Sequence, residues 1–137
     1  MEHKKHFRKR DAILSCVRGT DVHPSADWVY ARLKPEIPDL SLGTVYRNLS
    51  MFRQQGTVVS VGTVNGVERF DGNTVPHVHF ICTGCSAVMD MPQMQVPQQM
   101  ALSAAAELGG IVETCQLTFT GLCRECKENQ IKGGETA

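Results

Sequence analysis

The sequence predicts an α+β protein in which a winged helix is followed by a separate α/β module. Residues 7–55 carry apolar side chains at helical spacing in three segments, and two β-branched runs follow them. Residues 72–76 are rich in residues that favour turns, so we place a hinge there between domains at 1–71 and 77–137. In the second domain, two Cys-x-x-Cys pairs bracket a β-β-α-β pattern.

Two helices are predicted at the start of the first domain. The segment from Phe7 to Arg18 has apolar residues at helical spacing, and Gly19 ends it. Pro24 and Ser25 open the second helix, because proline suits a helix start and serine can cap it. Pro35 marks the end of this second helix.

A third helix and a hairpin complete the predicted winged helix. The helix runs from its candidate cap Ser41 to about Gln55. Three of its residues repeat at i, i+4 and i+7 and should face the core: Val45, Leu49 and Phe52. Strands at 57–61 and 67–70 follow, joined by Asn65-Gly66, the dipeptide that best tolerates the positive φ angles of a tight hairpin.

The second domain is predicted to contain strands at 77–82 and 87–91, a helix at about 94–108 and a long strand at 111–120, with a short segment after it. If the connection between the first two strands is a four-residue turn, Cys82 pairs with Ala87. Counting back along the pair then brings Asp90 opposite His79, within one residue.

Charge is distributed unevenly although the net charge is zero. Residues 1–75 carry 11 Lys+Arg and 8 Asp+Glu, a balance of +3, and residues 76–137 carry 3 and 6, a balance of −3. A basic first half favours phosphate as a partner, and a solvated lysine-rich face explains the basic charge nearly as well.

The chain has no apolar run long enough for a membrane span and no signal-peptide pattern, so we expect a cytoplasmic protein without a membrane partner.

Four of the six cysteines form two Cys-x-x-Cys pairs, which indicate a structural zinc site. Its expected ligands are Cys82, Cys85, Cys123 and Cys126, because four thiolates supply the closed tetrahedral cage that structural Zn²⁺ prefers. The alternatives are thiol redox chemistry and coincidence. Cys16 and Cys115 lie in apolar segments and are expected to be buried, inert thiols.

A second group of metal-ligand residue types surrounds the first cysteine pair. His77 and His79 alternate along the predicted strand, so both imidazoles should lie on one face, where Asp90 joins them. A His-x-His pair on a strand is often ordinary surface, and it is the neighbouring carboxylate that favours a metal site here.

The third helix is expected to present a face suited to the major groove. Its outward residues would be Thr44, Arg47, Asn48 and Met51, with Tyr46 at the edge and Ser41 available for phosphate. Arginine can bond guanine and asparagine can read adenine. A solvated helix face is the commoner situation, and only the winged-helix context favours DNA recognition.

Four motifs together resemble the ferric uptake regulator family in their order and spacing, over about Ala12 to Cys126. They are His23-Pro-Ser-Ala-Asp27, Ser41-Leu-Gly-Thr-Val-Tyr-Arg-Asn-Leu49, Arg69-Phe-Asp71 and His77-Val-His79-Phe-Ile-Cys82-Thr-Gly-Cys85. The resemblance implies an N-terminal winged helix-turn-helix DNA-binding domain and a C-terminal α/β dimerisation domain. The partners it implies are double-stranded operator DNA and a second copy of the chain.

The resemblance also implies a second, regulatory metal. The ligands it assigns are His23, Asp71, His77, His79 and Asp90. Three imidazoles and two carboxylates suit Fe²⁺ or Mn²⁺ and leave one position open. The chain is most similar to the peroxide-sensing branch, because both carboxylates are aspartates, whereas iron sensors typically have glutamate. Control of iron or zinc uptake is the alternative.

Two other classes are weaker. An enzyme is not expected, because the sequence has no Gly-rich phosphate loop, nucleophile elbow or His-Glu-x-x-His helix, and peroxide is the only small molecule we expect to react. A zinc-stabilised interaction module would leave Tyr46, Arg47 and the hairpin unexplained.

The family commonly has a further N-terminal helix, and here only six residues precede Phe7. The resemblance therefore does not assign that part of the DNA contact to this chain.

Overall fold

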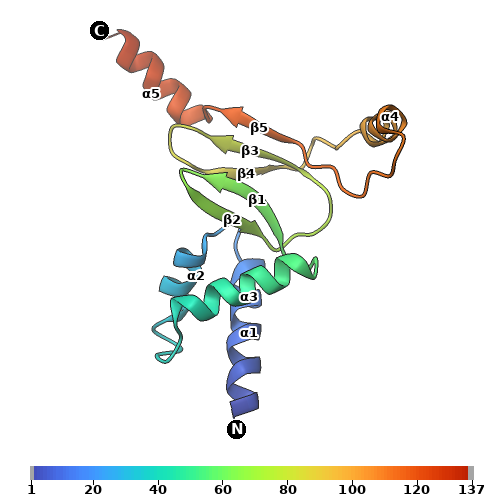
Figure 1. The fold of residues 1–137 in the computed structure, drawn as a ribbon. Coiled ribbons are helices and arrows are strands. Elements are labelled where there is room, and N and C mark those ends of the chain that lie inside the picture. The colour runs from blue at the N-terminus through green and yellow to red at the C-terminus, as the bar shows by residue number, and fades with distance from the viewer. Residues whose placement is uncertain (1, 136–137) are drawn as a thin grey trace. The chain divides into compact units, whose positions relative to one another are not determined.

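The computed structural model describes residues 2–135, and these fall into two compact units that divide between Thr74 and Val75 (Figure 1). The first unit contains three helices and a two-stranded sheet: α1 (Glu2–Arg18), α2 (Ala26–Leu33), α3 (Leu42–Gln54), β1 (Val59–Val64) and β2 (Val67–Asp71). This is the predicted winged helix. None of the helices within 2–135 is long and apolar enough to cross a membrane.

Both predicted helix caps are confirmed. The hydroxyl of Ser25 accepts from the backbone N–H of Trp28 at 3.1 Å, and that of Ser41 accepts from Thr44 at 3.1 Å. The first helix was predicted too short, since it begins at Glu2. The polar residues before Phe7 carry no apolar periodicity, but they also include no helix breaker.

The hairpin has the predicted turn and a displaced first strand. Asn65 and Gly66 have φ angles of 52° and 77°, as a tight turn between two right-twisted strands requires. The first strand extends to Val64 instead of ending at Val61, because the pairing register shifts between Ser60 and Gly62. The strand end was predicted from the β-branched run, which stops before Gly62, but the pairing with β2 continues past this irregularity to Val64.

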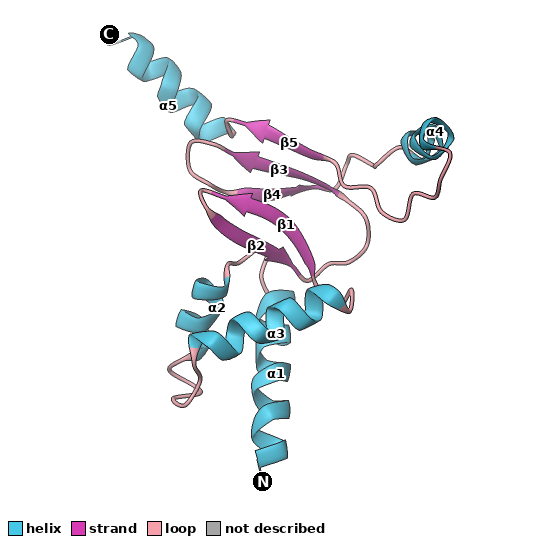
Figure 2. Cartoon of the chain, in the orientation of Figure 1, coloured by secondary structure: helices cyan, strands magenta, loops and turns pink. Residues whose placement is uncertain are grey.

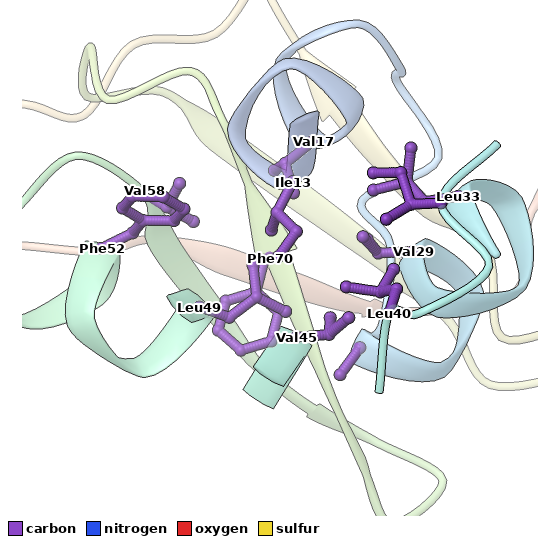
Figure 3. Close-up of a cluster of buried hydrophobic side chains, with 12 residues drawn as sticks. Ile13, Val17, Val29, Leu33, Leu40, Val45, Leu49, Phe52, Val58 and Phe70 are labelled. Carbon is purple, nitrogen blue, oxygen red and sulfur yellow. The ribbon is translucent and has the colours of Figure 1, made fainter. Parts of the chain in front are cut away.

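The core of the first unit joins all three helices to the hairpin. Val45 and Leu49 are fully buried and Phe52 nearly so, which confirms the predicted inner face of α3. They pack with Ile13 and Val17 of α1 and with residues of α2 and β2 in one cluster (Figure 3). The opposite face of α3 is therefore directed away from the core.

The second unit is built on a three-stranded sheet (Figure 2). Its elements are β3 (Val78–Cys82), β4 (Val88–Met91), α4 (Gln98–Leu108), β5 (Thr118–Gly121) and α5 (Arg124–Glu135). The strand order is β4-β3-β5, with β4 antiparallel and β5 parallel to β3. The predicted register is confirmed, since Cys82 donates its N–H to the carbonyl of Ala87 at 2.9 Å and His79 lies opposite Asp90.

Two predicted elements of this unit were wrong in extent. The helix begins at Gln98 instead of Met94, because Pro97 stands at its N-cap and proline disfavours helix in the residue before it. The long strand predicted at 111–120 is reduced to 118–121. The strand β5 is short because it pairs with β3 only from His79 to Cys82.

Candidate metal centres and nucleic-acid interface

The four paired cysteines converge in the second unit. Their sulfur atoms all lie within 4.8 Å of one another, and those of Cys85 and Cys123 are 3.9 Å apart. Four sulfurs around one tetrahedral ion at about 2.3 Å would be about 3.8 Å apart, so the spacing fits a single metal ion. Parallel pairing of β3 with β5 sets Cys82 beside Gly121 and so brings the two Cys-x-x-Cys turns together.

Hydrogen bonding within this cluster favours one thiolate. The backbone N–H of Cys123 donates to the Cys82 sulfur at 3.3 Å and is the largest cause lowering the Cys82 pKa to about 6. Hydrogen bonds to Cys82 and then Cys123 raise the pKa of Cys126 to about 12. A dication bound by the four sulfurs would replace the protons that the thiols otherwise carry.

Gly84 allows this cluster to close. A Cβ atom at this position would lie 2.9 Å from the sulfur of Cys126 and 3.1 Å from its Cβ. Any side chain at position 84 would therefore push the second cysteine pair away from the first. The sequence analysis named only the four cysteines for this site, so this constraint was not predicted.

Two histidines of the second unit converge on one carboxylate oxygen. The Oδ1 atom of Asp90 lies 2.9 Å from His77 Nε2 and 3.4 Å from His79 Nε2, and the two ring centroids are 4.2 Å apart. His79 and Asp90 face each other across the β3–β4 pair, and His77 immediately precedes β3. The predicted grouping of these three residues is present in the structure.

The tautomer of His77 follows from its other ring nitrogen. Nδ1 lies 2.6 Å from the carbonyl oxygen of Val75, and a carbonyl can only accept, so Nδ1 carries the hydrogen. Nε2, the other ring nitrogen, then faces the Asp90 carboxylate and has a free lone pair whenever the ring is neutral. Two acceptors 2.9 Å apart need a cation between or beside them, which a proton or a metal ion can supply.

In the first unit, His23 and Asp71 form a second histidine–carboxylate pair. Nε2 of His23 is 3.3 Å from Oδ2 of Asp71, and the residues are only 2% and 7% exposed. The other carboxylate oxygen, Oδ1, accepts from the backbone N–H of Asn73 at 2.9 Å. This leaves Oδ2 directed at the imidazole, in a buried environment where polar groups need partners.

The outer face of α3 matches the prediction in part. Tyr46 and Arg47 are exposed, and Thr44 and Asn48 are half-buried. The Arg47 guanidinium donates to the Thr44 hydroxyl at 3.0 Å, and the Asn48 amide donates to the Thr44 carbonyl at 2.8 Å. Met51 was expected to point outward, but it packs against the core cluster, because it lies beside the inner-face residue Phe52.

A groove of about 480 Å³ lies between α3 and the hairpin. Its lining includes Tyr46 and Arg47 from the exposed face of the helix and Glu68 from β2. Arg53 crosses it to form an ion pair with Glu68 at 3.1 Å. The exposed face of α3 and the wing strand β2 therefore line one groove, and winged helices contact a duplex through the recognition helix and the wing.

Comparison with known proteins gives consistent similarities over both units. The model of the ferric uptake regulator family matches residues 3–120. The peroxide-responsive repressor PerR of Staphylococcus epidermidis is 34% identical over 122 residues, which cover 88% of this chain and 79% of that protein. The peroxide stress regulator of Campylobacter jejuni superposes with a TM-score of 0.73 at 28% identity, covering 91% of this chain and 96% of that one. The ferric uptake regulator of Vibrio cholerae gives a TM-score of 0.64 at 26% identity, covering 83% and 88%.

Proposed function

Because the chain belongs to the ferric uptake regulator family of metal-responsive transcriptional regulators, we propose that it is a metal-dependent repressor that releases DNA in response to peroxide. The observation that carries the proposal is the pairing of imidazoles with an aspartate in each unit: His23 with Asp71, and His77 and His79 with Asp90. The relatives reported above include a peroxide-responsive repressor that is 34% identical to the chain, which supports this specific response.

The proposed regulatory ion takes ligands from both domains. Each histidine–aspartate group alone supplies too few donors for Fe²⁺ or Mn²⁺, which prefer octahedral sites of nitrogen and oxygen ligands. Together the two groups would supply three imidazoles and two carboxylates and leave one position for peroxide. An ion held in this way links the DNA-binding domain to the second domain, so metal binding and operator binding become coupled.

We propose structural zinc at the four-cysteine cluster. The sulfur spacing fits one tetrahedral ion, and the lowered pKa of Cys82 provides a thiolate at neutral pH. The site would connect the end of β3 to the start of α5, and so hold both ends of the second domain together.

We also propose that the second domain forms the dimer interface. Among the described residues, α4 buries none, and several of its apolar side chains and those after it are exposed: Met100, Leu102, Leu108 and Ile111. Leu108 and Ile111 are 74% and 86% exposed. A second copy of the chain would remove this apolar surface from water.

Replacement of Arg47 by alanine should lower sequence preference. The guanidinium is exposed on the proposed recognition face, and a base contact by arginine contributes roughly 1–3 kcal/mol of discrimination. The measurement is binding of the Mn²⁺-loaded protein to an operator selected from a random duplex pool, compared with unrelated DNA. Arg32→Ala, which removes the same charge from α2, is the matched control and should keep the preference. Equal loss on both DNAs for Arg47→Ala would contradict base contact.

Gly84→Ala should weaken zinc retention. The added Cβ would meet the Cys126 sulfur at 2.9 Å, so one ligand must move. We expect the variant to lose zinc to a chelator at least roughly tenfold faster than the parent, because displacement of one ligand weakens a metal site. Thr83→Ala changes the neighbouring exposed position and removes only the 3.1 Å hydrogen bond from its hydroxyl to Gly121, so it should retain zinc. Parental retention in Gly84→Ala would show that the cysteine cage does not need this close approach.

A further inference from the structure

Three consecutive residues of the wing strand β2, Arg69 to Asp71, contact the loop that carries His23. The N–H of Phe70 donates to the carbonyl of Pro24 at 2.9 Å. The guanidinium of Arg69 donates twice, from Nη2 to the carbonyl of Val22 at 2.7 Å and from Nε to the carbonyl of His23. Two adjacent carbonyls are thus bound by one rigid, planar donor group.

This contact coincides with an unfavourable backbone conformation. His23 has a φ angle of 55°, in the left-handed region that residues with a Cβ atom rarely adopt. Such a conformation persists where surrounding contacts determine it. Arg69 holds the carbonyl of His23 by a hydrogen bond. Asp71 lies on the same face of β2, and its Oδ2 atom is 3.3 Å from Nε2 of His23.

The guanidinium is partly buried at this position. Burial lowers the pKa of Arg69, but an arginine remains charged in proteins. The cost of removing this charge from water is offset by its two charge-assisted hydrogen bonds to carbonyls. Arg69 is therefore placed to determine the path of the loop, and the residue it acts on is a ligand of the proposed regulatory ion.

We propose that Arg69 is a positioning residue for the regulatory metal, which holds the turn at Val22–His23 so that the imidazole of His23 is presented beside Asp71. The proposal rests on the regulatory site proposed above. It also gives that site a direct connection to DNA, because β2 is a strand of the wing. An ion bound to His23 and Asp71 would act on the His23 loop and on β2, which are hydrogen-bonded to each other. By reciprocity, operator binding would raise the affinity of the site for the ion.

The test is the affinity of the full-length, zinc-loaded protein for Mn²⁺, measured by electron paramagnetic resonance. Arg69→Met should weaken Mn²⁺ binding by roughly tenfold to a hundredfold, the range for loss of a group that orients a ligand, and leave zinc content unchanged. Arg69→Lys keeps the charge and a single donor group and should recover part of the affinity. Arg53→Met, which removes only the exposed ion pair of β2 with α3, should bind Mn²⁺ as the parent does.

A double-mutant cycle separates positioning from a general structural role. If Arg69 acts through His23, Arg69→Met should have little further effect on Mn²⁺ affinity in a His23→Ala background. Additive losses, or parental affinity in Arg69→Met, would overturn the proposal for Arg69. Failure of the parent itself to bind Mn²⁺ would instead contradict the proposed regulatory site.

Discussion

Cys82→Ser and Cys123→Ser are each expected to lose zinc and to unfold the second domain. Among the described residues of this domain, the buried apolar side chains are Val78, Val88 and Cys82 itself. Burial of a large apolar side chain contributes about 1.5–3 kcal/mol, which is too little here to offset the entropy of ordering the domain. Structural zinc contributes an apparent 10–16 kcal/mol in small zinc domains, roughly the whole net stability of a folded domain.

Metal analysis and thermal unfolding test this expectation. The parent should hold about one zinc per chain, as a single tetrahedral site requires. Cys115→Ser is the matched control, because this cysteine lies in the same domain outside the cluster and should leave both measurements unchanged. Zinc should be retained at neutral pH and lost on acidification, since protons then compete with the ion for the four thiolates. Parental zinc content and stability in both serine variants would refute the assignment.

The sequence predicted the parts of the sites that depend on local geometry. Alternation along a strand and a four-residue turn were sufficient to place His79 opposite Asp90, and the structure has that register. Helix periodicity likewise identified the buried face of α3. In these cases a fixed repeat of the backbone determines where the side chains lie.

Predictions that depended on distant partners were less successful. The strand predicted at 111–120 shows favourable residues over its whole length, but a strand persists only where a neighbour pairs with it, and β3 ends the ladder at four residue pairs. Arg69 was missed as a site residue because its partners are carbonyls about 46 positions away, and a backbone carbonyl has no signal in the sequence. Strand alternation with Asp71 was the one available hint. The pairing of His23 with Asp71 came from the family resemblance alone.

The Fe²⁺-loaded protein is expected to lose operator binding on exposure to peroxide, and the Mn²⁺-loaded protein to keep it. Both ions suit the nitrogen and oxygen ligands, but only Fe²⁺ readily gives electrons to peroxide. One oxygen atom of the peroxide would be added to a ligand imidazole and the other would leave as water. Loss of a ligand would uncouple the two domains, and a thousandfold decrease in operator affinity would correspond to about 4 kcal/mol of lost coupling.

Operator binding before and after peroxide, with mass spectrometry of the peptides that contain His23 and His77, measures this response. The Mn²⁺ form is a control for thiol oxidation, because its six cysteines meet the same peroxide. Asp90→Glu is a matched variant. A longer carboxylate opposite His79 should preserve metal-dependent DNA binding but displace the ion from the imidazoles, so the peroxide response should weaken. Added oxygen on either histidine with iron alone is the expected result. If the iron form keeps its DNA and both histidines stay unmodified, control of iron or zinc uptake becomes the better assignment, because the same ligands would then report only whether a metal is bound.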